Sequence, residues 1–290
     1  MTRKSARSQQ ERMVVVMGPT GAGKSKFIEY ATGSNGNSVG HSWRSHTSDI
    51  QTVRAVHPTN GDSVVFVDTP GFDDTFKSDT EILTIVAEWL VGAKKGKVYV
   101  ATILYLHRIS DIRMSGSAMK NLRLFQSICG PNAMLNVAIV TTMWSKVGRK
   151  DGIDREEELR QEVWHDMVGD GCGIARFDDT PESAWRIVDN ASQTQASANV
   201  LLSSEVVDTH LRLNETTVGI TLNAELEKLI KDRKNAARKF KGYAKNGDNV
   251  LVKKELDEIE TKIGEIAEQL QQMKIPFTRR IRLFFKSKGN

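Results

Sequence analysis

Hydrophobic and polar positions follow two different patterns of spacing along the chain. Up to about residue 190, short apolar runs alternate with segments of helical spacing, whereas beyond residue 222 the helical spacing continues without strands. The apolar run at residues 13–17 is rich in valine and ends at a glycine, which is typical of a strand buried on both faces of a sheet. Alternating strand and helix signals predict a three-layer α/β domain with a mostly parallel sheet.

Each strand expected in this domain is a short apolar or β-branched run: residues 13–17, 52–57, 63–67, 97–106, 136–142 and 174–177. Each expected helix has apolar residues three or four positions apart: residues 26–31, 79–90, 115–129, 154–168 and a segment from Pro181 onward. Asp154 is the expected N-cap of the fourth helix, because acidic residues fill the turn that follows it. Asn60 and Gly61 supply the positive φ angles of a tight reversal, so the second and third strands are expected to pair antiparallel.

A polar stretch after residue 190 separates this domain from a region with a heptad pattern. The expected parts of the chain are an α/β domain at 13–190, a linker or helical connector at 191–221, an antiparallel helical hairpin or coiled coil at 222–275 and a basic amphipathic tail at 276–290. The apolar positions of the second helical arm step alternately by four and three: Val252, Leu256, Ile259, Ile263, Ile266, Leu270 and Met273. The first arm repeats this spacing more loosely: Leu222, Leu226, Leu229, Arg233, Ala236, Phe240 and Tyr243. A turn at Asn246 and Gly247 favours pairing within one chain, and a zipper between subunits is the alternative.

Composition excludes several classes of protein. The chain has 290 residues, of which 39% are hydrophobic and 27% are charged, which is enough apolar material for a full core. Two cysteines, Cys129 and Cys172, are too few for a disulfide framework or a four-thiolate zinc site. The longest apolar stretch, residues 98–106, is far shorter than a membrane span, and the first residues do not read as a signal peptide. These features predict a cytoplasmic protein.

A glycine-rich motif follows the first strand directly. Residues 18–25 read Gly-Pro-Thr-Gly-Ala-Gly-Lys-Ser, which matches the P-loop pattern G-x-x-x-x-G-K-S between a strand and a helix. Glycines let backbone N–H groups turn inward around phosphate oxygens, and the helix N-terminus adds its positive dipole end. The expected nucleotide contacts here are Gly18, Thr20, Gly21, Ala22, Gly23, Lys24, Ser25 and Lys26. Lys24 is expected to reach the β- and γ-phosphates, and Ser25 is expected to bind Mg²⁺.

Two further segments carry candidate ligands for the same site. Asp68 ends a buried strand and opens the sequence Asp-Thr-Pro-Gly. Because α/β sheets bind ligands at the carboxyl ends of their strands, Asp68 is a candidate for Mg²⁺, and the N–H of Gly71 is a candidate for the γ-phosphate. A polar segment at residues 33–51 lies between the two motifs and is expected to act as a switch, with Thr47 as a further hydroxyl ligand of Mg²⁺.

These motifs resemble those of septin-like and immunity-associated GTPases, the latter of the avirulence-induced-gene type (GIMAP). The likeness covers about residues 13–190 and is carried by GPTGAGKS, SHTSDIQ, VVFVDTPGFDDT and YLHRISDIRMSG, of which the first and third are specific. One antiparallel strand in a mostly parallel sheet is similar to the Ras-like G domain. The resemblance implies binding of GTP with Mg²⁺, slow hydrolysis and a nucleotide-dependent homodimer formed across the nucleotide face.

The chain departs from this family where the guanine base is recognised. In the family, a Thr/Asn-Lys-x-Asp motif after the corresponding strand carries a carboxylate that accepts two hydrogen bonds from guanine. Here the chain reads Thr141, Thr142, Met143, Trp144 and Ser145, so the carboxylate is missing and Trp144 is expected in its place. Thr142 and Trp144 are the candidates for nucleotide contact, since an indole can stack on a purine face although it cannot accept a hydrogen bond. ATP as the substrate, and a core position for Trp144, are the alternatives.

A second departure concerns hydrolysis. Ras-like enzymes place a water-orienting glutamine just after the Asp-x-x-Gly motif, whereas this chain has Phe72. The candidates that could assist hydrolysis instead are His46, Thr47, Ser48, Asp73 and Asp74. A residue from a dimer partner is the other source, and Arg108 and Arg113 lie in a loop that could serve there. We therefore expect slow turnover by the isolated protein.

The last segment combines positive charge with apolar residues. Six lysines and arginines but no acidic residue lie in residues 273–288, between Ile, Leu and Phe. Contact with an anionic membrane, packing of the phenylalanines on the protein and a disordered tail are three alternatives. The net charge of +5 has no nucleic-acid reading motif beside it, so no specific nucleic acid is expected. Three functions follow as hypotheses: a GTPase switch, an ATPase on the same scaffold, and a weakly hydrolysing nucleotide-binding scaffold at membranes.

Overall fold

The computed structural model describes residues 11–33, 50–72, 77–191, 197–244 and 250–273. The chain divides into two compact units, Met1–Thr209 and His210–Asn290, each of which is described by itself. Within the described residues, no helix is both long enough and apolar enough to cross a membrane.

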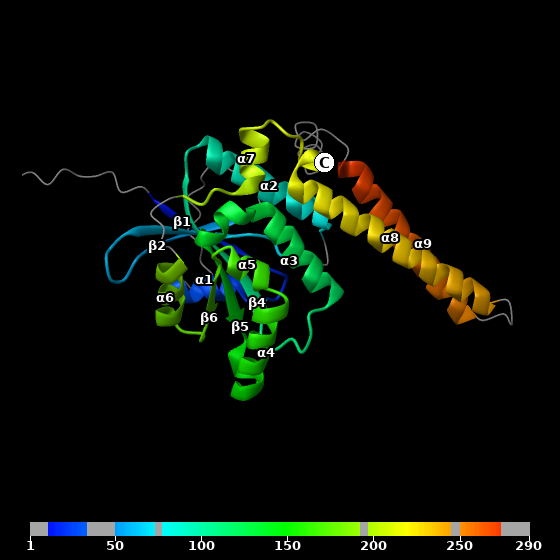
Figure 1. The fold of residues 1–290 in the computed structure, drawn as a ribbon, viewed down its shortest axis with the longest axis horizontal. Helices are drawn as coiled ribbons and strands as arrows, with labels where there is room; N and C mark the ends of the chain where they lie inside the picture. The colour runs from blue at the N-terminus through cyan, green and yellow to red at the C-terminus, as the bar shows by residue number, and fades with distance from the viewer. Residues whose placement is uncertain (1–10, 34–49, 73–76, 192–196, 245–249, 274–290) are drawn as a thin grey trace, which may run out of the picture. The chain divides into compact units, whose positions relative to one another are not determined.

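The first unit is built around one six-stranded sheet (Figure 1). Its strands are β1 (Arg12–Met17), β2 (Gln51–Val56), β3 (Ser63–Asp68), β4 (Tyr99–Arg108), β5 (Val137–Thr142) and β6 (Gly173–Arg176). They lie in the order β2-β3-β1-β4-β5-β6, with β2 and β3 antiparallel and all other neighbours parallel. This confirms the Ras-like sheet that the sequence predicted, including its single antiparallel strand.

Helices cover both faces of this sheet. α1 (Lys24–Thr32) and α6 (Pro181–Ala191) share one core with the strands, in which Phe27 and Trp185 both meet Phe66 edge to face. α3 (Gly116–Cys129) lies on the other face, where the ring of Phe125 is 4.6 Å from that of Tyr105 on β4. α2 (Asp79–Lys95) begins at a complete capping box between Ser78 and Glu81 and is joined to α3 by an ion pair of Asp79 with Lys120.

The helix expected at residues 154–168 is two helices, so that prediction was wrong. α4 (Arg149–Glu162) begins five residues earlier than Asp154, after Gly148, and α5 (His165–Gly169) follows it. The break occurs because the N–H groups of Val163 and Trp164 both donate to the carbonyl of Leu159, which ends the regular ladder. The side chain of Trp164 is fully buried there, so a change of chain direction inserts an indole into the core.

The first unit continues beyond the boundary that we expected at residue 190. α7 (Leu201–Val207) packs on α2 and α3, and the segment before it joins β4, where the N–H of Ala198 donates to the carbonyl of Val100 at 2.8 Å. Lys94 at the end of α2 donates to the hydroxyl of Ser204 at 2.8 Å. A segment that sequence composition describes as a polar connector is therefore tied to the sheet by main-chain and side-chain hydrogen bonds.

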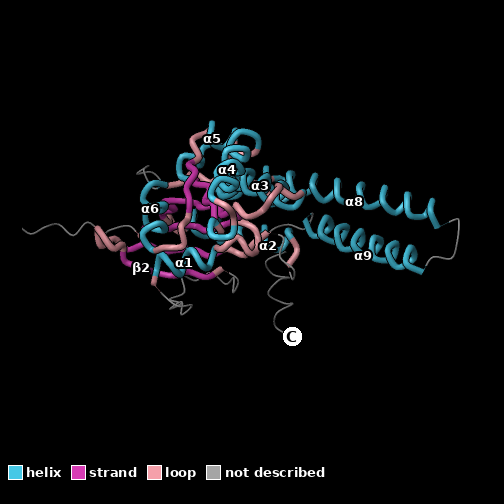
Figure 2. Tube along the Cα trace, turned by 90° about the horizontal axis from the view of Figure 1, so that it is seen from below, coloured by secondary structure: helices cyan, strands magenta, loops and turns pink. Residues whose placement is uncertain are grey.

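The second unit consists of a short 3₁₀ turn, η3 (Leu213–Glu215), and two long helices, α8 (Thr217–Ala244) and α9 (Val250–Met273). The two helices run side by side (Figure 2). Leu222 and Leu226 of α8 are buried, as is Ile266 of α9, and all three belong to the heptad positions named from the sequence. The tail at residues 276–290 lies outside the described residues.

Candidate nucleotide site

The carboxyl ends of several parallel strands meet at one edge of the sheet. β1 leads into the P-loop at residues 18–25, β3 ends at Asp68 and β5 ends at Thr142. The registers align Val16 of β1 with Asp68, and Arg108 at the end of β4 with Thr142. The fold therefore gathers at one edge the three segments that the sequence singled out separately.

The glycines of the P-loop are required by its geometry. Gly18 has φ 137°, and a Cβ atom there would lie 2.6 Å from the carbonyl oxygen of Leu106, which is too close for any side chain. Gly21 and Gly23 also have positive φ angles, 78° and 94°. Because side chains disfavour this region, the tight turn depends on glycine at these positions. The turn delivers the chain directly into the first residue of α1, so the positive end of this helix points at the loop.

Lys24 lies beneath this loop. Its side chain is buried, and its ammonium group donates to the carbonyls of Gly18 and Pro19, each at 3.1 Å. These bonds hold a positive charge at the centre of the turn, beside backbone N–H groups that carry partial positive charge themselves. The arrangement is suited to a polyanion.

Asp68 faces the P-loop from β3. The hydroxyl of Ser25 donates to Oδ2 of Asp68 at 2.6 Å. Oδ1 of the same carboxylate is buried and has no hydrogen-bond partner among the described residues. Burial raises the pKa of Asp68, and the Ser25 hydrogen bond and the charge of Lys24 counteract this only in part. A buried carboxylate oxygen without a partner is unfavourable, so this site is suited to a cation or to water.

The described residues by themselves supply few ligands to such a cation. Within the described residues, no group of three or more His, Cys, Asp or Glu side chains could hold a metal ion. A hard cation such as Mg²⁺ commonly keeps water and phosphate oxygens in its coordination shell and takes one or two oxygens from the protein. Ser25 and Asp68 fit that pattern, in which the substrate completes the site.

The segment after Asp68 packs tightly on the P-loop. A Cβ atom on Gly71 would lie 2.6 Å from the backbone nitrogen of Thr20 and 2.8 Å from the ammonium of Lys24. Phe72 is buried, and its carbonyl accepts a hydrogen bond from the N–H of Thr20 at 3.2 Å. Phe72 is thus a core residue that also fixes the loop, and its side chain cannot take the part of a glutamine that orients water.

The end of β5 is tied to the P-loop through Thr142. This buried hydroxyl donates to the carbonyl of Ala22 at 2.9 Å and contacts the carbonyl of His107 at 3.3 Å. Met143 follows with φ 62°, and its methyl group lies 3.8 Å from the position of a Cβ on Gly23. With Thr142 as the first residue of the family motif Thr/Asn-Lys-x-Asp, Met143 stands in place of the lysine and the exposed Ser145 in place of the aspartate.

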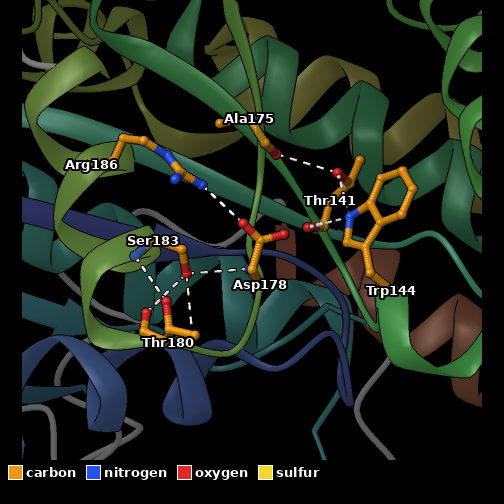
Figure 3. A network of polar contacts seen from close by, with 7 residues as sticks. All are labelled: Thr141, Trp144, Ala175, Asp178, Thr180, Ser183 and Arg186. Atoms are coloured by element: carbon orange, nitrogen blue, oxygen red, sulfur yellow. Dashed lines mark hydrogen bonds and ion pairs between the residues drawn. The ribbon is translucent and has the colours of Figure 1, made fainter. Parts of the chain in front are cut away.

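Trp144, which we expected in place of the aspartate, occupies the variable position of that motif instead, because β5 ends at Thr142. Its indole N–H donates to the carbonyl and the hydroxyl of Thr141 at 3.2 and 3.1 Å (Figure 3). The guanidinium of Arg176 lies 4.5 Å from the ring centroid, and the ring edge meets Gly152 of α4. Trp144 therefore packs between β5, β6 and α4, and the stacking on a purine that we expected from the sequence stays a prediction.

Two aspartates that our sequence analysis left out lie in the loop between β6 and α6. Asp178 pairs with Arg186 at 2.9 Å, and its N–H donates to the hydroxyl of Ser183 at 3.2 Å (Figure 3). Asp179 has φ 56° and pairs with Lys26 at 3.2 Å, so the loop is joined to the first turn of α1. The signal in the sequence was Asp-Asp-Thr directly after the last strand, at the edge where ligands bind.

A guanidinium from the end of β4 also approaches the P-loop. Nη1 of Arg108 lies 3.2 Å from the position that a Cβ atom on Gly21 would occupy. The Nε and Nη2 atoms of Arg108 both lie 3.1 Å from Oδ2 of Asp111, which holds the guanidinium. Arg155 of α4 donates to the carbonyls of Ile109 and Ser110 and so fixes the loop backbone. Asp111 therefore fixes the Arg108 guanidinium beside Gly21, and Arg155 fixes the loop that follows.

Several candidates from the sequence lie outside the described residues: His46, Thr47, Ser48, Asp73 and Asp74. Their expected roles in hydrolysis and Mg²⁺ binding stay predictions. Of the P-loop candidates, Thr20, Gly21, Ser25 and Lys26 are exposed, while Gly18, Ala22 and Lys24 are buried.

The fold and this site define a P-loop nucleoside triphosphatase with a Ras-like G domain. In agreement with this class, residues 13–119 match a protein family described as 50S ribosome-binding GTPase, a match that covers less than half of the chain. A search of curated proteins finds no match to this sequence.

Solved structures show the same fold. Toc33 from Arabidopsis thaliana in complex with Mg²⁺ and GMPPNP superposes with a TM-score of 0.50 at 15% sequence identity, over 66% of this chain and 88% of that chain. Toc33 in complex with GDP and Mg²⁺ gives a TM-score of 0.50 at 14% identity, over 67% of this chain and 88% of that chain. At this level of identity the likeness establishes a shared G-domain fold. Neither comparison is specific for septin-like or immunity-associated GTPases.

Proposed function

We propose that this protein binds GTP together with Mg²⁺ and hydrolyses it slowly, as a nucleotide-dependent switch. The observation that carries the proposal is the buried Oδ1 atom of Asp68, which has no partner among the described residues and lies on the carboxylate bonded to Ser25. Lys24 provides the positive charge beside it. Carboxylate, hydroxyl and ammonium groups beside a glycine-rich turn form a site for a metal-bound triphosphate.

Mg²⁺, when bound, would neutralise phosphate charge and stabilise the charge that develops on hydrolysis. Ser25 and Asp68 would hold it, with Thr47 as a further candidate. The chain's own groups bind and orient the phosphates: the P-loop N–H groups surround them, and Lys24 bridges them. The resident Mg²⁺ of one similar fold, Toc33 with GMPPNP, supports this choice of cation.

We propose GTP rather than ATP as the nucleotide. Its guanine base must then be recognised by other groups than the aspartate of the Thr/Asn-Lys-x-Asp motif. Ser145 lacks the carboxylate that would accept hydrogen bonds from guanine. Asp178 and Asp179 supply carboxylates at the same edge of the sheet, from the next loop along it. The guanine nucleotides bound to Toc33 support GTP, whereas the loss of the motif's aspartate is the observation that favours ATP.

Slow hydrolysis follows from the position of Phe72. Its side chain is buried and cannot orient water, and the candidates His46, Ser48 and Asp73 lie outside the described residues. Arg108 provides a positive charge at the loop that could stabilise the transition state, either within its own chain or across a homodimer interface. We propose that a second copy completes the site, so that turnover rises with protein concentration.

The proposal also includes the family membership, the helix movement, the membrane contact and the cellular location that the sequence predicts. Membership among septin-like or immunity-associated GTPases rests on the four motifs alone. Nucleotide-dependent movement of α8 and α9, membrane contact through residues 276–290, and a cytoplasmic location with peripheral membrane attachment are further parts of it. A scaffold at membranes that barely hydrolyses is the second candidate function.

Competition between GTP and ATP for a fluorescent guanine nucleotide analogue tests the nucleotide. We expect GTP to displace the analogue at least tenfold better than ATP in the presence of Mg²⁺, and Asp178→Asn or Asp179→Asn to reduce that ratio. Lys24→Ala should lose binding, while Thr221→Val in the second unit is a matched control that should not. An ATP preference of tenfold would reject GTP, and equal binding by Lys24→Ala and the unmodified protein would reject the site itself.

A further inference from the structure

The order of the strands decides on which side of the P-loop a nucleoside can lie. β3 is on one side of β1, and β4, β5 and β6 are on the other. Asp68 and Gly71, which the proposed function assigns to Mg²⁺ and to the γ-phosphate, follow β3. A triphosphate whose terminal phosphates lie on the β3 side therefore directs its nucleoside toward the loops after β5 and β6.

Each of these two loops contains a backbone conformation that is rare for a residue with a side chain. Met143 has φ 62° and Asp179 has φ 56°, in the left-handed region that favours glycine. Aspartate tolerates this region, because its short polar side chain can form local hydrogen bonds. Methionine has no such compensation, and backbone strain of this kind clusters at functional sites. Met143 is therefore the residue in these loops whose conformation calls for a functional reason.

The residue after Met143 is held by a closed network of contacts. The indole N–H of Trp144 donates to the hydroxyl of Thr141 at 3.1 Å, and this hydroxyl lies 2.9 Å from the carboxylate of Glu156. Glu156 also accepts a hydrogen bond from Nε of Arg176 at 2.8 Å. The guanidinium of Arg176 returns to the face of the Trp144 ring, 4.5 Å from its centroid. The network ties the loop to β5, β6 and α4.

α4 leaves space for the indole because residue 152 is glycine. A Cβ atom on Gly152 would lie 2.7 Å from the ring of Trp144. Gly152 is buried inside a helix, where glycine is otherwise unfavourable. Trp144 is thus held at its N–H group, at one face and at one edge, so it anchors the loop. Its neighbours Met143 and Ser145 are the side chains beside it that keep exposed surface.

The residue before Met143 is bonded to the P-loop itself. The hydroxyl of Thr142 donates to the carbonyl of Ala22 at 2.9 Å. The methyl group of Met143 lies 3.8 Å from the position of a Cβ on Gly23, and the side chain is only half-buried. Part of an apolar side chain is therefore presented beside the phosphate-binding turn by a loop that is fixed on both sides. Such preorganisation lowers the cost of ordering the site when a ligand binds.

The chemistry of methionine limits what this contact can do. A thioether is polarisable and makes favourable contacts with aromatic rings, but it is only a weak hydrogen-bond acceptor. Guanine and adenine differ in their hydrogen-bonding groups and share the same aromatic ring system. A thioether therefore adds affinity for either base and distinguishes little between them. It also carries no charge, unlike the lysine of the family motif, so it adds nothing to phosphate binding.

We propose, building on the proposed function, that Met143 contacts the purine base of the bound nucleotide through its thioether and adds affinity without selecting the base. Trp144 is the positioning residue that keeps Met143 in place. Selection of guanine over adenine then depends on other groups, such as the carboxylates of Asp178 and Asp179.

NMR of the full-length protein, labelled with ¹³C at its methionine methyl groups, tests this contact directly. Met143→Leu removes one of the nine methionine resonances and so identifies that of Met143. With GTP and Mg²⁺ bound, we expect an NOE between the Met143 methyl group and H8 of guanine. Bound GTP that gives no such NOE would overturn the proposal. Failure of GTP to bind at all would instead reject the proposed function.

Competition for the fluorescent nucleotide analogue measures the effect on affinity. Met143→Gly should weaken GTP about fivefold, the scale of one thioether–aromatic contact, and ATP by the same factor. Met143→Leu has a similar volume and should keep GTP affinity within about twofold. Lys97→Gly is the matched control, because Lys97 also has a positive φ angle, 53°, and lies outside the site.

Two outcomes of the competition assay would overturn the proposal: unchanged GTP affinity in Met143→Gly, or a ratio of GTP to ATP affinity that changes severalfold. Lys97→Gly should leave both affinities unchanged, and an equal loss in this variant would likewise count against Met143. Met143→Gly should not lower the melting temperature, because glycine suits the positive φ angle. A weaker affinity then reports the lost contact and not unfolding.

Discussion

The two halves of the nucleotide site are built by the same edge of the sheet but in different ways. In the phosphate half, a glycine turn, Lys24, Ser25 and Asp68 provide the groups that a metal-bound triphosphate requires. In the base half, Thr142 keeps its structural bond to the P-loop, while Ser145 replaces the carboxylate that would select guanine. The bond between the two halves is therefore kept although the carboxylate of the family motif is absent.

Removing Lys24 should have the largest effect on the phosphate half. Lys24→Ala eliminates the charge that the carbonyls of Gly18 and Pro19 hold at the centre of the turn, so triphosphate affinity should fall by about 3 kcal/mol, roughly 100-fold or more. Isothermal titration calorimetry with GTP and Mg²⁺ measures it. Lys95→Ala is the matched control, because Lys95 is an exposed lysine at the carboxyl end of α2 and has no place in the proposed site. If the two variants lose the same affinity, Lys24 has no special place in the site.

Asp68→Asn should reduce nucleotide affinity by about 2 kcal/mol in the presence of Mg²⁺ and much less in EDTA. The pKa of Asp68 is raised by burial, so lowering the pH from neutral should weaken Mg²⁺-dependent binding in the unmodified protein sooner than an ordinary aspartate would. The carboxamide introduced by Asp68→Asn does not titrate, which should flatten that part of the profile. Binding that is equally Mg²⁺-dependent in both proteins would contradict the assignment.

Asp68→Asn should lower nucleotide affinity, but it should not lower the stability of the nucleotide-free protein. A carboxyl whose pKa is raised in the folded state binds its proton more tightly there, so the folded state loses stability as the pH rises through that pKa. Asp68→Asn removes this loss and should melt at least as high as the unmodified protein at pH 7 to 8. The difference should vanish below the pKa of an unfolded aspartate, about 3.9. Asp62→Asn, in the turn between β2 and β3, is the control.

The bond between the two halves can be tested next. Thr142→Val keeps the shape of the side chain but removes the hydroxyl that donates to the carbonyl of Ala22. We expect the free energy of unfolding to fall by about 1–2 kcal/mol, because a buried carbonyl loses its partner, with a smaller loss of nucleotide affinity. Thr32→Val is the control, since the hydroxyl of Thr32 donates within its own helix, to the carbonyl of Ile28. Equal melting of both variants would show that the bond contributes nothing.

Restoring the carboxylate in the base half should have the smallest effect. Ser145→Asp should raise the ratio of GTP affinity to ATP affinity by about tenfold, because a carboxylate accepts two hydrogen bonds from guanine. Ser145→Asn has the same shape without the charge and should leave the ratio nearly unchanged. An unchanged ratio in Ser145→Asp would mean that guanine is read from another loop, as by Asp178 or Asp179.

Most of the G-domain fold followed from local signals. The β-branched runs and the Asn-Gly turn predicted the strands and the single antiparallel pair, which the structure confirms. The break between α4 and α5 was missed, because the burial of Trp164 depends on distant residues and leaves the helical spacing intact. At residues 191–221 the sequence predicted a linker or helical connector, and α7 lies in that range, but the polar composition gave no sign of the bonds to Val100 and Lys94.

The sequence by itself determined the P-loop, because the glycine turn, Lys24 and Ser25 lie within one short stretch whose chemistry is local. It also supplied Asp68, through its place at the end of a buried strand. Only the tertiary structure decided that Trp144 packs between β5, β6 and α4, that Arg108 approaches Gly21, and that Met143 lies against Gly23. These outcomes depend on how distant segments pack together, and no spacing along the chain encodes them.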